Sequence, residues 1–191
     1  MARRSLLILM LVAICASVLA FAGPASATTD YRPDAWIKLC GLSTGCTINP
    51  LPHPWRGNDV YNTTASGQAL DIRMEEGEGV RYWITLQNDG ALGDKIVVQG
   101  CKGNNHFEVN RVVLGLVKRP DAGATKVTNR FLEGTLKFAF PPSSENKKVV
   151  FTLNIIAKTK KQGVSYRCPI TIHSAADPSI KDTVSATMTT I

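Results

Sequence analysis

The fold class of this chain is decided by one stretch of sequence, Val149-Val150-Phe151-Thr152-Leu153-Asn154-Ile155-Ile156-Ala157. Apolar side chains occupy every second position from Val149 to Ala157, and a period of two places them on one face of an extended strand. The Val, Ile and Phe residues favour a strand over a helix. Because this is the longest apolar stripe in the chain, we predict that the strand lies in the middle of a sheet.

The segments before and after this stretch repeat the alternation. Residues 136–140 alternate and end at two prolines, whereas residues 166–172 follow a polar turn rich in Lys. Farther upstream, residues 80–87 also alternate. They lead into Asn88-Asp89-Gly90, which is a hairpin-turn sequence. We therefore predict that residues 95–99 return as the pairing partner of this strand.

Turn signals recur about every 8 to 12 residues and no segment shows a helical period, which predicts about seven to nine strands. An all-β, antiparallel β-sandwich over residues 68–191 is therefore expected. Residues 28–67 differ, because they are rich in Pro, Gly, Asn and Thr. Prolines at alternate positions from residue 50 to residue 54 exclude a helix and a central strand. We predict an irregular N-terminal arm there, with a short edge strand at residues 35–39.

Residues 1–27 have the organisation of a secretory signal peptide. Arg3 and Arg4 precede an uncharged apolar run over residues 6–22, and Ala25-Ser26-Ala27 supplies the small residues of a cleavage site. We predict cleavage after Ala27, with an uncleaved membrane anchor as the alternative. Cleavage would leave 164 of the 191 residues and lower the net charge from +7 to +5. The product would be secreted, in the extracellular space or at the cell surface, with no membrane segment.

The exported chain keeps four cysteines, and an even number in an exported protein indicates disulfides. Cys40 and Cys46 flank a short Gly-rich segment that could close on itself. Cys101 and Cys168 would then form a long-range bridge. The other two connectivities remain open, but a zinc site would need closely spaced cysteine pairs that residues 101 and 168 do not provide.

One motif near the end of the chain resembles a known family. In Tyr166-Arg167-Cys168, a Tyr stands two residues before a Cys at the start of a late strand, which is similar to the tyrosine corner of immunoglobulin-like domains. The closing strands, with Ser174–Pro178 and Lys181–Val184, resemble those of bacterial cell-surface immunoglobulin-like modules. Such modules accompany galactosidase-type carbohydrate-binding modules and occur in adhesion-related proteins.

The resemblance covers residues 68–191 and implies an immunoglobulin-like β-sandwich that takes part in extracellular contacts. It also implies that the Tyr166 hydroxyl bonds the backbone of the preceding turn. The sequence departs from the antibody pattern, because residues 70–74 contain no cysteine and Cys101 follows Trp83. An antibody-type disulfide is therefore not implied.

No catalytic or metal-binding motif is present in the sequence. The three histidines are far apart: His53, His106 and His173. None has a second His at metal spacing or an acid at catalytic spacing, and paired cysteines cannot act as nucleophiles. The acidic run at residues 75–78 is interpreted as a solvated turn. Calcium held by Asn88, Asp89 or Asp94 is the remaining alternative, without the spaced acidic pattern of such sites. We predict a protein that is not an enzyme and needs no cofactor or metal.

The candidate binding residues are three tryptophans, Trp36, Trp55 and Trp83. Trp83 alternates with Tyr82 and Ile84, so its ring points away from the core face. It lies either beneath the arm, packed by Trp36 or Trp55, or exposed as a platform for a ligand.

These observations predict a non-catalytic secreted or cell-surface protein that acts as an interaction or adhesion module. Its partner would be an extracellular protein or a glycan. A nucleic-acid partner is not expected for an exported protein whose lysine-rich loop tips have no interleaved aromatic residues. One alternative is a self-assembling subunit of an extracellular filament or surface layer, in which the arm adds a strand to another copy. The other is a carbohydrate-binding accessory module.

Overall fold

The computed structural model describes residues 31–42, 54–115, 125–143 and 147–191. The predicted signal peptide and Cys46 lie outside these ranges. The described elements are nine strands and one short helix, in the order β1 (Pro33–Leu42), β2 (Ala69–Met74), β3 (Gly79–Asn88), β4 (Asp94–Gln99), β5 (Phe107–Leu114), α2 (Thr128–Leu132), β6 (Leu136–Phe140), β7 (Val149–Ala157), β8 (Ser165–Ser174) and β9 (Lys181–Thr190). Within the described ranges, no helix has the length and hydropathy needed to cross a membrane.

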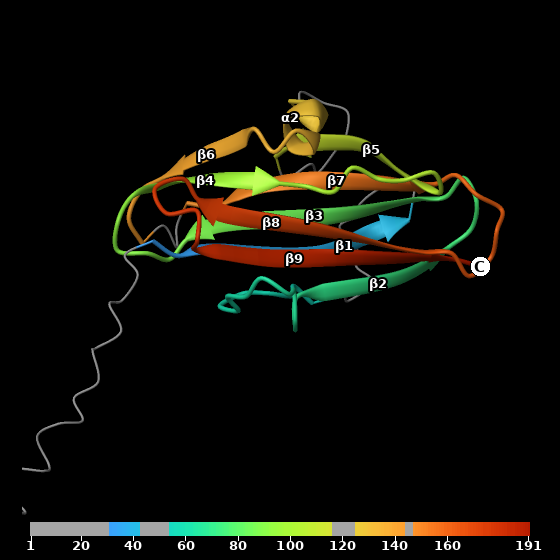
Figure 1. Ribbon diagram of the computed structural model, residues 1–191, viewed down its shortest axis with the longest axis horizontal. Helices are drawn as coiled ribbons and strands as arrows, with labels where there is room; N and C mark the ends of the chain where they lie inside the picture. The colour runs from blue at the N-terminus through green and yellow to red at the C-terminus, as the bar shows by residue number, and fades with distance from the viewer. Residues whose placement is uncertain (1–30, 43–53, 116–124, 144–146) are drawn as a thin grey trace, which may run out of the picture.

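The strands form two packed sheets, so the predicted β-sandwich is confirmed. The first sheet has the order β1-β3-β7-β5, and the second has the order β2-β9-β8-β4-β6. Figure 1 shows the two layers, with α2 at one edge beside β5. The prediction that residues 149–157 form a central strand is also confirmed, because β7 pairs with β3 on one side and with β5 on the other.

The core lies between the inner faces of the two sheets. From β7, Phe151, Leu153 and Ile155 are fully buried, and they belong to one apolar cluster with Ile170 and Ile172 of β8. Burial of such side chains stabilises a fold by about 1.5 to 3 kcal/mol each. The alternate apolar positions in the sequence of β7 and β8 are therefore the residues that pack the two sheets together.

The predicted hairpin between residues 80–87 and 95–99 is wrong. β3 pairs with β1 and β7 in the first sheet, whereas β4 pairs with β6 and β8 in the second. The reason lies in the fully buried Asn88, whose Nδ2 donates to the carbonyls of Leu92 (2.7 Å) and Pro141 (3.1 Å). Its Oδ1 accepts the Gly90 N–H (3.0 Å). These bonds hold the Asn-Asp-Gly segment as the start of a connection from one sheet to the other.

The segment predicted as an irregular arm contributes a full strand to the sandwich. β1 pairs antiparallel with β3 and is longer than the predicted strand at residues 35–39. Ala35 and Ile37 are fully buried in the core. The edge of β1 that faces away from β3 is bonded at one position, since Ile37 and Arg56 exchange two backbone hydrogen bonds of 2.8 Å. Strand addition to a second copy stays a prediction, and it would require β1 to leave this sheet.

One strand pair departs from the antiparallel prediction, because β2 runs parallel to β9. The chain reaches β2 alongside β9 in the same direction. Just before β2, the carbonyls of Asn62 and Gln68 accept the N–H groups of Thr183 (2.8 Å) and Ser185 (3.1 Å). The segment from residue 54 to residue 68 is thereby fixed across the β1 side of the sandwich, where the candidate site lies.

Candidate functional site: a groove at the end of the first sheet

A groove of about 420 Å³ lies where β1 begins and β3 ends. Four separate segments supply its walls: the residues at the start of β1, the loop after Arg56, the end of β3, and the residue before β7. The lining residues are Arg32, Trp36, Asn58, Asp59, Tyr61, Gln87, Asp89 and Lys148. The groove therefore combines two aromatic rings with carboxylates, amides and basic groups.

A buried carboxyl group lies against this groove. Asp34 is fully buried, and its Oδ2 accepts hydrogen bonds from the Trp36 indole N–H and from the Asp59 backbone N–H (3.4 Å). Its Oδ1 has no hydrogen-bond partner among the described residues. Burial raises the pKa of the Asp34 carboxyl to about 7, and the negative charges of Asp182 and Asp89 act in the same direction. Asp34 fixes the orientation of the Trp36 ring from below.

Tyr61 and Asp89 are a second hydrogen-bonded pair in the groove lining. The Tyr61 hydroxyl donates to Asp89 Oδ2 (2.6 Å), and the Gln87 side-chain amide donates to Asp89 Oδ1. Burial and the neighbouring Asp89 carboxylate raise the pKa of the Tyr61 hydroxyl, so it remains a proton donor. The Arg32 guanidinium lies 4.2 Å from the centre of the Tyr61 ring. Asp89 is thus held in one orientation by two donors.

Cations cover both rings of the groove. Lys148 Nζ lies 4.1 Å from the centre of the Trp36 ring, as Arg32 lies over Tyr61. Such cation–π contacts are worth about 0.5 to 1 kcal/mol at exposed sites. Because long Lys and Arg side chains change rotamer on a sub-microsecond timescale, a ligand can displace them from the ring faces.

The loop that carries Asp59 and Tyr61 is anchored by a second buried carboxylate, Asp182. It accepts the backbone N–H groups of Ala35 (2.8 Å), Asn62 (3.1 Å) and Thr183 (2.8 Å). The Gln68 side-chain amide also donates to it (3.0 Å). Burial raises the pKa of Asp182, although these hydrogen bonds oppose the shift. One carboxylate therefore ties β1, β9 and the groove loop together.

The three predicted tryptophans lie together beside the groove. The Trp55 ring stacks on Trp83 with centroids 6.4 Å apart, and it meets Trp36 edge-on at 6.1 Å. Trp83 is therefore packed by a residue of the predicted arm. Of the three, only Trp36 lines the groove. We call this set the tryptophan cluster.

The structure contains the predicted long-range disulfide between Cys101 and Cys168. Cys40 is also disulfide-bonded, and its pairing with Cys46 stays a prediction because residue 46 lies outside the described residues. The Tyr166 hydroxyl accepts the Gly103 N–H (2.9 Å), and its ring stacks on Phe107 at 5.6 Å. Its backbone partner is therefore in the segment after Cys101, and not in the turn before β8 as the resemblance implied.

The histidines and the acidic run lie away from the groove. His106 and His173 do not line it, and His53 lies outside the described ranges. Glu78 accepts the Glu75 backbone N–H (2.7 Å) within an exposed turn. In the part of the chain that the structure describes, no group of three His, Cys, Asp or Glu residues is placed to hold a metal ion.

Most of the groove residues were not identified from the sequence. Four of them stand in three places along the chain, Arg32, the pair Asp59 and Tyr61, and Lys148, and no spacing rule connects the three. The one local signal is the pair Asp34 and Trp36, a carboxylate and an indole on the same face of a strand.

Comparison with known proteins gives a likeness at the level of structure. No protein-family model matches the chain, and no curated protein matches it. BcpA, the major pilin subunit of Bacillus cereus, is 13% identical with a TM-score of 0.41 over 84% of this chain and 40% of that one. A family 123 glycoside hydrolase from Clostridium perfringens is 10% identical with a TM-score of 0.41 over 66% and 23%. The N-terminal domain of PorA is 11% identical with a TM-score of 0.34 over 64% and 86%. The chain thus spans less than half the length of the pilin and of the hydrolase, and its function has to be argued from its own groove.

Proposed function

We propose that this protein is a non-catalytic extracellular binding module whose groove holds a hydroxyl-rich ligand, a glycan. The observation that carries the proposal is the groove itself, in which the rings of Trp36 and Tyr61 stand among side chains of both charges. Ligand sites combine apolar surface with a few placed polar groups. Here the polar groups predominate, which favours a polar ligand over a lipid or a drug-like one.

The hydrogen-bonding groups of the groove suit a sugar in particular. A hydroxyl group both donates and accepts a hydrogen bond, and it therefore needs both kinds of partner. The Asp59 and Asp89 carboxylates accept, Arg32 and Lys148 donate, and Asn58 does both. The aromatic rings supply flat apolar surface for the C–H faces of a sugar ring once the cations have moved aside.

The position of Asp34 supports a binding role over a catalytic one. A carboxyl with a pKa near 7 would suit general acid catalysis. A catalytic acid must reach the atom that it protonates, however, and Asp34 is fully buried beneath Trp36 and the Asp59 backbone. Its proton is therefore separated from any ligand in the groove.

An extracellular location is supported by two observations. The Cys101–Cys168 disulfide is of the kind that persists in oxidising compartments. The N-terminal sequence predicts export, and the mature chain would begin at residue 28.

A glycan array probed with the labelled mature protein tests the proposal, followed by calorimetric titration of the best ligand. We expect Asp59→Ala and Arg32→Ala to weaken binding at least tenfold, because each removes a charge-assisted hydrogen bond of about 1.5 to 3 kcal/mol. Lys160→Ala serves as the matched control, since Lys160 is 86% exposed and pairs only loosely with Glu76 at 3.6 Å. The proposal is wrong if no glycan binds at millimolar concentration, or if both groove variants bind as well as the control.

A further inference from the structure

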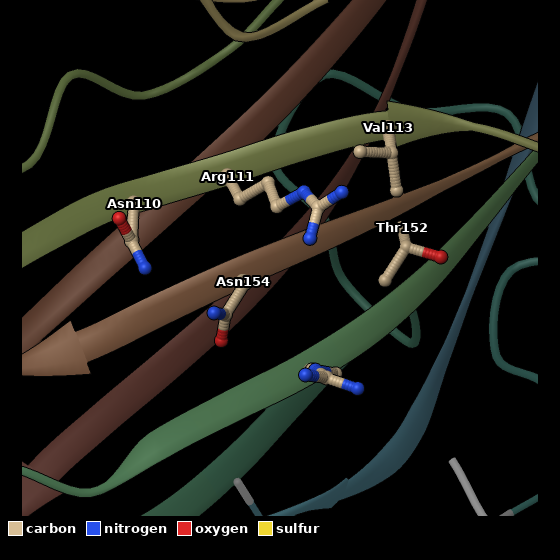
Figure 2. Close-up of a pocket in the computed structure, with 6 residues that line it drawn as sticks. Asn110, Arg111, Val113, Thr152 and Asn154 are labelled. Carbon is tan, nitrogen blue, oxygen red and sulfur yellow. The ribbon is translucent and has the colours of Figure 1, made fainter. Parts of the chain in front are cut away.

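A second and smaller cavity, of about 170 Å³, lies on the outer face of the first sheet. Three neighbouring strands line it with Arg81 from β3, Asn110, Arg111 and Val113 from β5, and Thr152 and Asn154 from β7. Figure 2 shows the labelled side chains spread along β5 and β7, with the Arg111 guanidinium extending over β7. None of the six lining residues is acidic. We call this cavity the arginine pocket.

The register of the sheet places two arginines on either side of one amide. Asn154 of the central strand pairs with Arg81 on β3 and with Arg111 on β5. A shift in the β5–β7 register between Val109 and Arg111 inserts Asn110 as an extra residue. Bulges of this kind redirect side chains, and here both Asn110 and Arg111 line the pocket.

Several polar atoms of the pocket are buried without a partner. Within the described residues, Arg81 Nη1, Thr152 Oγ1 and Asn154 Oδ1 have no hydrogen-bond partner. Thr152 is only 5% exposed, so its hydroxyl is withdrawn from solvent as well. Buried polar groups are nearly always satisfied in native proteins. Arg81 Nη1 and Thr152 Oγ1 can donate to a ligand that accepts hydrogen bonds, whereas Asn154 Oδ1 only accepts and would have to exchange places with its own amide nitrogen to contact such a ligand.

We propose that the arginine pocket binds an oxyanion, that is, a carboxylate, sulfate or phosphate group. The planar guanidinium of Arg81 donates in a fork that matches two oxygens of such a group. The Thr152 hydroxyl and the side-chain amide of Asn110 are further donors, and Arg111 adds positive charge from the opposite strand. The anion would come either as a free ion or as an acidic group on a larger polymer, and the chemistry at the pocket is the same for both.

The arginine pocket is separate from the groove, since the two share no lining residue. Both lie on the first sheet, and Trp83 follows Arg81 by two residues on the same face of β3. The oxyanion inference therefore goes beyond the proposed function and can fail or succeed without it.

The test is a titration of the mature protein with inorganic phosphate and with sulfate at constant ionic strength, followed by NMR and by the thermal midpoint. We expect saturable binding, a rise in the midpoint, and at least a tenfold loss of affinity in Arg81→Gln. Arg73→Gln is the matched control, because Arg73 is an exposed arginine on β2 of the other sheet. If Arg81→Gln does not fold, Thr152→Val replaces it as the test variant, because it keeps the shape of the side chain. We expect Thr152→Val to weaken anion binding about threefold.

Two further arms separate the sources and the sites. The anion is carried by a polymer if an acidic oligosaccharide binds more tightly than phosphate and the affinity for its neutral counterpart is the same in Arg81→Gln and the wild type. If phosphate binds as tightly as the acidic oligosaccharide, the free ion suffices. Tyr61→Phe should leave phosphate binding unchanged. An absence of saturable binding of any of these anions up to millimolar concentration, or equal affinity in Arg81→Gln and Arg73→Gln, would overturn the inference.

Discussion

The outer faces of the two sheets differ in how their polar side chains are bonded. On the second sheet, short hydroxyl side chains pair across strands, as Thr171 does with Thr183 (3.0 Å) and Ser165 with Thr189 (2.8 Å). On the first sheet, polar side chains leave buried atoms without partners among the described residues: Arg81 Nη1, Trp83 Nε1, Gln87 Oε1, Thr152 Oγ1 and Asn154 Oδ1. The second sheet also has unpartnered buried atoms, Ser185 Oγ and Asp94 Oδ2, but the first sheet has more of them, and we therefore associate the first sheet with binding and the second with support. The predictions below test this division.

The largest expected effect concerns the disulfide of the second sheet. Cys101→Ala combined with Cys168→Ala removes a cross-link that spans 67 residues, which by loop-closure entropy stabilises the fold by about 4 kcal/mol. Denaturant unfolding of the variant and the wild type measures the difference. Ligand binding by the folded variant should persist, because neither cysteine lines the groove. A loss below about 1 kcal/mol would show that the bridge is not a main support.

The next effect concerns Asp34, which lies on β1 of the first sheet. Its pKa is raised in the folded state, from 3.8 to about 7, so the folded protein holds this proton more tightly than the unfolded chain does. That stabilisation is complete below pH 3.8 and is lost as the pH rises through 7. As the pH rises from 5 to 9, the free energy of unfolding of Asp34→Asn should therefore increase by about 2 to 3 kcal/mol relative to that of the wild type.

Unfolding free energies at several pH values check this, with Asp71→Asn as the control because Asp71 is exposed on β2. Asp182 contributes a slope of the same sign, since burial raises its pKa as well. That slope should remain in the Asp34→Asn variant. Parallel pH profiles for the variant and the wild type would contradict the burial of an ionisable Asp34.

A smaller effect is expected at the tryptophan cluster. Trp55→Ala removes one stacked and one edge-on ring contact, and aromatic pairs contribute about 0.5 to 1.5 kcal/mol each beyond their buried area. We expect a loss of about 2 kcal/mol and a red shift of the fluorescence from Trp36 and Trp83 as water reaches them. Unchanged emission would mean that Trp55 does not cover them.

The smallest expected effect concerns a side-chain pair of the second sheet. Thr171→Val removes one cross-strand hydroxyl pair with Thr183, which is worth at most about 1 kcal/mol. Glycan and phosphate binding should both stay at the wild-type level. A measurable loss of either affinity would show that the second sheet also takes part in binding, and the division between the two faces would then fail.

The sequence predicted what depends on local pattern. The period of two identified β7 as a central strand and Trp83 as an outward residue, and cysteine spacing favoured the Cys101–Cys168 bridge. The hairpin after β3 was predicted wrongly because the Asn88 side chain bonds to Leu92 and Pro141, and no local rule reveals a partner 53 residues away.

The groove and the arginine pocket could not be predicted for a related reason. Each is assembled by strand order, which brings Arg81 and Arg111 to the two sides of β7. Strand order across two sheets follows from the packing of the whole core, and alternation along a single strand does not encode it.

The described strands also determine how the domain would respond to a pulling force. β1 begins at the Lys181 end of the sandwich, where the Ala35 N–H meets Asp182, whereas β9 ends beside Met74, whose carbonyl accepts the Ile191 N–H (3.2 Å). Figure 1 shows β1 running toward the end where the C-terminus lies. Traction between residues 33 and 190 would therefore act along the strand axes. It would load the β1–β3 hydrogen bonds and those that β9 makes with both β8 and β2 in shear, instead of opening them one at a time. Resistance to forced unfolding is a matter of rate, so this geometry can provide mechanical strength that an equilibrium measurement of stability would not reveal.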